Sequence, residues 1–420
     1  MNGIRAIEIP ELAQMYHVAP EMLKGLMERN PGLRSLSTDS KTCLEQAMQT
    51  LPNQLTTLKV RISLPITDAL HILTAFPRLK TLYLSDNTRS SRSLMRESQE
   101  GLVGDATAVR GLPLPLRFLK VTTLSGAAQL SEILEQSPDL QHLHVQESEW
   151  IDEATLGMLR SGYFVRLTSL VLGHYAGSAI ELVKAIPPHQ LRDISIIDPH
   201  EPCMLQAVAE HQGQRLEHLE LSFRYERVHG LMGLLAQCPA LRSLRVNGNA
   251  GCLVNTQCLL KQPWACVLLE DLKIPLALPR WAETLAKQGP EVNPTDVMPE
   301  VPEWQQAEMH LMKQLGALTR LRRLDATTDL TFDTDETMDL TWCLNAGLGF
   351  LAKLEKLEVL DVSGQQYVQG ITELQWMKKY LKKLSKLVVR MIGVQEKNWL
   401  CNHWPDLKVR DLDINPFEDY

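Results

Sequence analysis

One short sequence pattern is repeated along this 420-residue chain. The copies include "FPRLKTLYLSDN", "SPDLQHLHVQES", "GQRLEHLELSFR" and "CPALRSLRVNGN", which share the pattern apolar-x-x-apolar-x-apolar. The pattern begins fifteen times, at Ile4, Leu33, Leu55, Leu79, Leu116, Leu140, Leu167, Leu191, Leu216, Leu241, Leu269, Leu321, Leu357, Leu384 and Val409. Eleven of the fourteen gaps between starts lie between 22 and 29 residues, and the others, of 37, 52 and 36, read as a repeat plus an inserted loop. A single period therefore organises the whole chain.

The segments between the starts have helical periodicity. Leu231, Leu234, Leu235 and Cys238 recur at the spacing of one helix face, and prolines such as Pro239 follow, where they stop a helix. Each unit is then a strand, a turn and a helix, and it buries its apolar face only against its neighbours. The sequence predicts an α/β leucine-rich-repeat solenoid, a horseshoe with parallel strands on the concave face and helices on the convex face.

Two inserts divide this array. We expect a main horseshoe over 1–278, a proline-rich acidic insert over 279–304, and C-terminal repeats over 305–420 that continue the same solenoid. The other insert, 86–115, lies earlier in the chain, is rich in serine and arginine, and is predicted to be a mobile surface loop. Its serines near arginine, Ser91 and Ser93, are candidate phosphorylation sites.

The N-terminal stretch "IRAIEI", residues 4–9, already follows the strand pattern. Terminal repeats need a polar cap, because an open end exposes the apolar ladder. We therefore expect this edge to be covered by a preceding segment, a partner or a second copy.

The totals exclude several classes of protein. A formal charge of −7 gives no overall attraction to nucleic acid or to an anionic membrane, so neither is expected as a partner. No apolar run reaches the roughly 18 residues that span a bilayer, and the N-terminus does not resemble a signal peptide. Eight cysteines spread over this length indicate reduced thiols, and hence a cytoplasmic or nuclear protein.

The third and fifth positions of the pattern point away from the leucine core, onto the exposed face of the sheet. Repeats three to six carry basic and aromatic residues there or close by, namely Lys59, Arg61, Tyr83, Phe118, Lys120, His142 and His144. Three later residues complete the predicted partner-binding set: His218, Glu220 and Arg245. After Lys273 the fifth positions turn acidic, with Asp325 and Asp361. The alternative interpretation is a solvated strand face of mixed charge.

Metal and cofactor chemistry finds no support in these patterns. His142 and His144 lie two apart on one strand face, but no carboxylate or cysteine is placed to complete a metal site. Cys252, Cys258 and Cys266 lack the spacing of zinc ligands and are interpreted as buried structural thiols. We predict no metal and no cofactor.

Two charged motifs have ordinary surface interpretations. "LTFDTDET" resembles a phosphatase motif in which Asp333 would be the nucleophile and Asp335 the general acid, but it lies in an insert, where an acidic loop is the default. The basic run "MKKYLKKLSK", residues 377–386, could attract anionic lipid or calmodulin, but it is typical of a solvated outer helix face with Leu381 and Leu384 packed inward. We predict no catalytic residue.

The stretch "CPALRSLRV" resembles the cysteine-containing repeats of F-box/LRR proteins. Two further stretches, "WACVLLEDLKI" (264–274) and "LEKLEVLDVSGQQYVQGITELQWMKKYLKKL" (354–384), resemble the F-box/LRR-like proteins that are multiplied in some early-diverging fungi. The resemblance implies repeats that capture a substrate for a ubiquitin ligase, with an F-box that docks to the ligase. The N-terminal "IPELAQMYHVAPEML" does not match an F-box, so ligase subunits are expected as partners only if an F-box precedes this chain.

Taken together, the sequence predicts a non-enzymatic scaffold that binds a protein partner on the concave face. Within that class it is the candidate substrate-receptor part of an F-box-type adaptor. A leucine-rich-repeat regulator of a small GTPase is the alternative, and a phosphatase at Asp333 and Asp335 is a remote one.

Overall fold

The repeated apolar residues stack into a buried ladder, as the pattern predicts. In the computed structural model the second apolar residue of the pattern pairs in register with its counterpart on the next strand: Leu36 lies opposite Leu58, and Leu58 opposite Leu82. All three side chains are fully buried. Because each leucine fills the space between neighbouring repeats, burial of this ladder is the main stabilising contribution in the chain.

The structure describes the following residues: 5–9, 20–62, 66–85, 113–122, 130–147, 151, 153–174, 179–197, 203–223, 231–248, 254–255, 263–279, 303–327, 337–338, 340–363, 370–389 and 392–411. Most of the two inserts, at 86–112 and 280–302, lies outside this set, as do Asp333 and Asp335. The proposed boundaries at 279 and 304 stay predictions.

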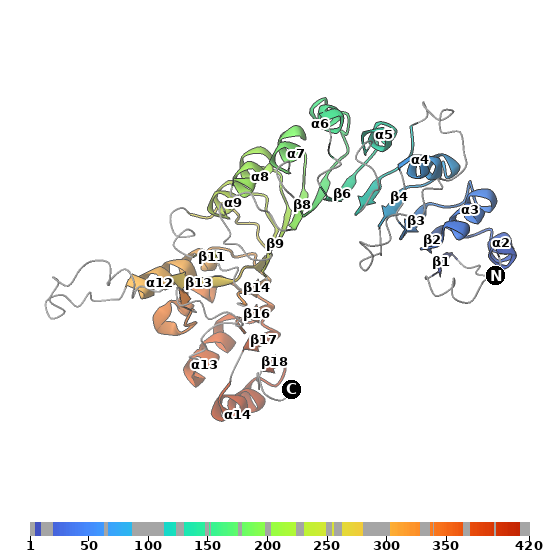
Figure 1. The fold of residues 1–420 in the computed structure, drawn as a ribbon. Helices are drawn as coiled ribbons and strands as arrows, with labels where there is room; N and C mark the ends of the chain where they lie inside the picture. Colours follow the sequence, from blue (N-terminus) through green and yellow to red (C-terminus); the bar gives the residue numbers. More distant parts are fainter. Residues whose placement is uncertain are drawn as a thin grey trace. The chain divides into compact units, whose positions relative to one another are not determined.

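The chain forms two compact units, of which the first spans Met1–Leu191. Its parallel strands follow one another in chain order: β1 (Ala6–Ile9), β2 (Ser35–Thr38), β3 (Thr57–Val60), β4 (Thr81–Leu84), β5 (Phe118–Val121), β6 (His142–Glu147) and β7 (Ser169–His174). Its helices are α2 (Pro20–Glu28), α3 (Lys41–Thr50), α4 (Ile66–Ala75), α5 (Leu130–Glu135), α6 (Glu153–Arg160) and α7 (Ala179–Ala185). The helices lie along one side of the strands (Figure 1).

The second unit spans Arg192–Tyr420 and repeats the arrangement. Its parallel strands are β8 (Asp193–Ile197), β9 (His218–Phe223), β10 (Ser243–Gly248), β12 (Asp271–Lys273), β14 (Arg323–Asp325), β16 (Val359–Asp361), β17 (Lys386–Val389) and β18 (Lys408–Asp411). Its helices are α8 (Met204–Gln212), α9 (Leu231–Gln237), α12 (Glu303–Gly316), α13 (Ile371–Tyr380) and α14 (Val394–His403), with 3₁₀ helices η3 (Leu344–Ala346) and η4 (Leu348–Lys353). The predicted alternation of strand and helix is confirmed in both units.

A small additional sheet was not predicted. It joins β11 (Val254–Asn255), β13 (Leu276–Pro279) and β15 (Thr337–Met338), with β11 parallel and β15 antiparallel to β13. Its strands come from stretches outside the leucine pattern, so the repeat period gave no signal for them.

The turn from helix to strand has a recurring geometry. The N–H of the first leucine donates to the carbonyl three residues earlier, as from Leu140 to Ser137 and from Leu241 to Cys238, each at 3.2 Å. Cys238 follows α9 and is fully buried together with Leu234, which confirms the predicted inward helix face. This tight turn fixes where each strand begins.

Two sequence expectations need correction. The last strand pairs Leu387 with Val409, whereas a repeat that starts at Val409 would place Leu384 opposite it. Leu407 is the buried residue there, and Val409 is 36% exposed. The last repeat is therefore shorter than the sequence pattern suggested. The basic run 377–386 is not one helix: α13 ends at Tyr380, and the rest forms a turn and the start of β17, although Leu381 and Leu384 are buried as expected.

Candidate partner-binding surface

The third and fifth pattern positions lie on the sheet surface that faces away from the helices, here called the strand face. In β4 and β5 the side chains alternate between half-buried and buried, with the leucines and valine inside. This alternation follows from the two-residue period of a strand. The predicted outward direction of these positions is therefore what the burial pattern shows.

In the first unit, four of these side chains form a continuous chain of contacts. The ammonium of Lys59 lies 5.1 Å from the ring centre of Tyr83, within the range of a cation–π interaction. The Tyr83 and Phe118 ring centres are 5.0 Å apart, and those of Phe118 and His142 are 5.8 Å apart. Each contact joins neighbouring strands, from β3 to β6, so the sheet itself spaces the groups.

Lys120 and His144 continue the row of fifth positions. Lys59 pairs in register with Tyr83, Tyr83 with Lys120, and Lys120 with His144. Burial, with a smaller effect from the charge of Lys120, lowers the pKa of His144 to about 4. His144 is thus neutral at physiological pH, and Lys120 is the last cation of the row.

Arg61 lies at the margin of this surface. It follows β3, is half-buried, and its backbone N–H donates to the carbonyl of Thr38 at 2.9 Å. We call the seven predicted residues of the first unit the basic-aromatic patch: Lys59, Arg61, Tyr83, Phe118, Lys120, His142 and His144.

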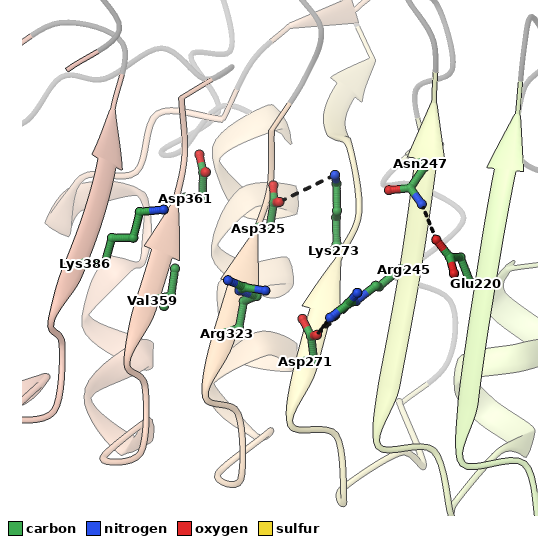
Figure 2. Close-up of a pocket in the computed structure, with 10 residues that line it drawn as sticks. All are labelled: Glu220, Arg245, Asn247, Asp271, Lys273, Arg323, Asp325, Val359, Asp361 and Lys386. Carbon is green, nitrogen blue, oxygen red and sulfur yellow. Dashed lines mark hydrogen bonds and ion pairs between the residues drawn. The ribbon is translucent and has the colours of Figure 1, made fainter. Parts of the chain in front are cut away.

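The strand face of the second unit has a different character. It contains a hollow of about 300 Å³ lined by charged side chains (Figure 2). The lining residues are Glu220, Arg245, Asn247, Asp271, Lys273, Arg323, Asp325, Val359, Asp361 and Lys386. Acidic and basic groups alternate across the strands, so no single sign of charge dominates the hollow.

Several of these charges are paired with each other (Figure 2). Arg245 bonds to Asp271, and Lys273 lies 3.9 Å from the carboxylate of Asp325. Asn247 donates from its side-chain amide to Glu220 at 2.9 Å. These groups are already partly neutralised before any partner arrives.

Two neighbouring strands end in the same local turn. Oδ1 of Asp325 accepts from the N–H and hydroxyl of Thr327, and Oδ1 of Asp361 accepts from the N–H and hydroxyl of Ser363. Asp325 and Asp361 pair in register. Burial raises the pKa of Asp361, and the charge of Asp325 adds to this rise, although the hydrogen bond from the Ser363 hydroxyl opposes it. The turns hold both carboxylates in the lining of the hollow.

The predicted partner-binding residues therefore fall into two groups, one in each unit. Seven lie in the first unit, as the basic-aromatic patch. His218, Glu220 and Arg245 lie in the second unit, where the exposed His218 ring is 3.9 Å from Asp193 and the other two line the hollow.

The repeat pattern places most charges of the hollow at outward positions, including Asp271 and Arg323 at third positions, but Asn247, Val359 and Lys386 were missed. Val359 and Lys386 occupy third positions of the same pattern and could have been found by reading every strand. Asn247 lies beyond the fifth position, and only the strand length of β10 brings it to this face.

The described ranges contain no cluster of metal ligands: no three histidine, cysteine or acidic side chains come together there. Cys266 is a free, buried thiol, as predicted, whereas Cys252 and Cys258 lie outside the described residues. None of the helices in these ranges has the length and apolar content needed to cross a membrane.

The repeat pattern and the parallel, helix-backed sheets define a leucine-rich-repeat protein. No protein-family model matches the sequence, and no curated protein matches it either. Among solved structures the chain is similar to a plant peptide hormone receptor, RGFR1, in complex with RGF2, at 13% identity and a TM-score of 0.37. The match covers 93% of this chain and 51% of the receptor chain, so this chain spans about half of the receptor's length.

Proposed function

We propose that this chain is a non-enzymatic protein-recognition scaffold that binds its partner through the basic-aromatic patch. The observation that carries the proposal is the contact chain from Lys59 through Tyr83 and Phe118 to His142. Aromatic and basic residues are favoured at the centres of protein interfaces. Side chains that are already held by their neighbours lose little conformational entropy on binding.

The two lysines of the patch, Lys59 and Lys120, are accessible to a partner's charges. Within the described residues, neither Lys59 nor Lys120 forms an ion pair with a carboxylate, in contrast to Arg245 and Lys273 of the second unit. A partner can therefore engage these lysines without displacing an internal ion pair. This difference makes the first unit the better candidate.

The resemblance to F-box/LRR proteins leads to a finer proposal, in which the captured protein is a ubiquitin-ligase substrate. Regulation of a small GTPase is the alternative partner class. Phosphatase chemistry would depend on Asp333 and Asp335, which lie outside the described residues.

Affinity purification of the full chain from its source cells tests the proposal. We expect a set of proteins that is retained by the wild type and lost by the Lys59→Glu/Lys120→Glu variant. Lys184→Glu is the matched control, because Lys184 is an exposed lysine on α7, on the helix side of the same unit. Circular dichroism and thermal unfolding are used to check that the wild type and both variants are folded.

The identity of the retained proteins distinguishes the ubiquitin-ligase adaptor from the small-GTPase regulator. Ligase subunits support the adaptor, and a GTPase supports the regulator. If the folded double variant retains the same proteins as the wild type, the patch is not the binding surface.

A further inference from the structure

The strand face of the first unit carries no acidic residue at its outward positions from β2 to β7. These positions are Ser35, Ser37, Thr57, Lys59, Thr81, Tyr83, Phe118, Lys120, His142, His144, Ser169 and Val171. The corresponding positions of the second unit carry both signs of charge, and several of them are paired. In a chain of net charge −7, the lysine charges at these positions are therefore not offset by an acidic residue at the same positions.

The aromatic rings of the patch are flanked by their neighbours along the row. Tyr83 has Lys59 on the side of β3 and Phe118 on the side of β5, and Phe118 in turn has His142 on the side of β6. Side chains stand roughly perpendicular to a sheet, so rings packed side by side present their edges to solvent. Ring edges carry partial positive charge, whereas the faces carry partial negative charge.

This geometry distinguishes two kinds of anionic partner. Single-stranded nucleic acid binds such surfaces by stacking its bases on open ring faces. Here each ring has a neighbouring group on both sides, with centres 5.0 to 5.8 Å away and the ring pairs tilted by 36° to 37°, which leaves little room for a stacked base beside Tyr83 or Phe118. Ring edges that reach solvent would attract negative charge, as the lysines do. A carboxylate-bearing partner fits these edges and ammonium groups better than a stacked base does.

The spacing of the two lysines adds a constraint. Lys59 on β3 and Lys120 on β5 are separated by one strand, so their backbones lie about 10 Å apart at the usual strand spacing. Tyr83 lies between them in register, and Phe118 lies two residues before Lys120. The surface therefore offers two cationic points with an aromatic floor between them.

We infer that the basic-aromatic patch binds an acidic segment of a partner protein, with two carboxylates at Lys59 and Lys120 and an apolar side chain against Tyr83 and Phe118. The inference rests on the proposed function and specifies the chemistry of its partner. The neutral His144 ring then contributes a hydrogen bond rather than a charge at the end of the row.

Selection of a random-peptide phage library against the full chain tests the inference. We expect the enriched peptides to be acidic, to bind about tenfold more weakly to Lys59→Glu/Lys120→Glu, and to bind normally to Lys184→Glu. Replacing their glutamates by glutamine is expected to cause a similar loss. Fluorescence anisotropy of synthetic copies measures both effects, and binding is expected to weaken as salt is raised.

An oligouridine probe is titrated in the same assay. The inference is overturned if oligouridine binds the patch and the acidic peptides do not, or if the enriched peptides lack carboxylates. If that happens while the double variant still loses its co-purified proteins, protein recognition by the patch stands and only the acidic partner is wrong. If the double variant loses no protein in the purification, the proposed function itself fails.

Discussion

Arg245 directs both Nε and Nη2 at a single oxygen of Asp271, at 3.0 and 2.5 Å. The two residues are diagonal neighbours, because Asp271 pairs in register with Ser243 and Arg245 with Lys273. The hydrogen bond and the charge of Asp271 raise the pKa of Arg245. The pair forms part of the charged lining of the hollow in the second unit.

A double-mutant cycle with Arg245→Ala and Asp271→Ala measures what this pair contributes. We expect a coupling free energy of about 0.5–1 kcal/mol in urea unfolding, since the side chains are 46% and 20% exposed and solvent screens them. The more distant, exposed pair of Arg192 and Glu217, at 3.4 Å, serves as the comparison and should couple more weakly. Coupling no larger than in that pair would mean that the short contact adds nothing.

Leu219 should be among the most sensitive core positions. It is 1% exposed and pairs in register with Ile194 and Leu244 on the neighbouring strands. Leu219→Ala removes buried methyl groups and leaves a cavity, so we expect a loss of about 2–5 kcal/mol in unfolding free energy. His218→Ala, an exposed change on the same strand, should stay within about 0.5 kcal/mol. A loss below about 1 kcal/mol for Leu219→Ala would contradict the buried position of this residue in the core.

Glu308 holds the backbone before η3 from the middle of α12. Its buried Oε1 accepts hydrogen bonds from the N–H groups of Thr341 and Trp342, at 2.6 and 3.2 Å, where Trp342 has a positive φ of 48°. Glu308→Ala leaves both donors without this acceptor, whereas Glu308→Gln keeps an oxygen there. We expect the alanine variant to be about 2–4 kcal/mol less stable than the glutamine variant in urea unfolding.

The same residue predicts a pH effect. Burial raises the pKa of Glu308, although the backbone hydrogen bonds oppose the shift. The folded state therefore keeps this proton to a higher pH than the unfolded state, so the stabilising contribution is full below the ordinary carboxyl pKa and declines as pH rises through the raised value. Comparing wild type with Glu308→Gln across that range isolates the effect; parallel curves would rule it out.

His144 should titrate at unusually low pH. Burial, and secondarily the charge of Lys120, lowers its pKa to about 4. The unfolded chain takes up this proton near pH 6.5 and the folded chain only near 4, so the stability that depends on neutral His144 is complete above pH 6.5 and is lost as pH falls toward 4. NMR titration, with His144→Gln to assign the signal, measures the pKa directly. Lys120→Ala is expected to raise it, and an unchanged value in that variant would remove Lys120 as a cause.

The cysteines should divide by burial. Burial raises the thiol pKa of Cys238 and Cys266 to about 12, and both side chains are fully buried. Cys203 and Cys401 are exposed. Because the thiolate is the reactive form, iodoacetamide at neutral pH is expected to modify the exposed pair and spare the buried pair. Peptide mass spectrometry reads the outcome, and rapid labelling of Cys238 in the folded chain would contradict it.

The fold of this protein could be predicted from its sequence because a single period carries the information. Leucines that recur every 22 to 29 residues have only one way to become buried together, which is to stack on their counterparts in the next unit. The inward residues, such as Leu219, and the outward positions, such as Lys59 and Tyr83, follow from the same pattern. The last repeat is the exception: the sequence pattern starts at Val409, whereas the buried residue is Leu407, four residues after the end of α14.

Only the tertiary structure decided which outward side chains meet. Arg245 reaches diagonally to Asp271 rather than to its register partner, and Glu308 bonds to backbone groups more than thirty residues away. Such contacts depend on the side-chain rotamers and on the strand spacing, which bring together residues that no sequence interval relates. The sequence alone therefore determined the scaffold and the rows of outward side chains, whereas packing between strands determined that one unit pairs several of its charges internally and the other leaves its lysines beside aromatic rings.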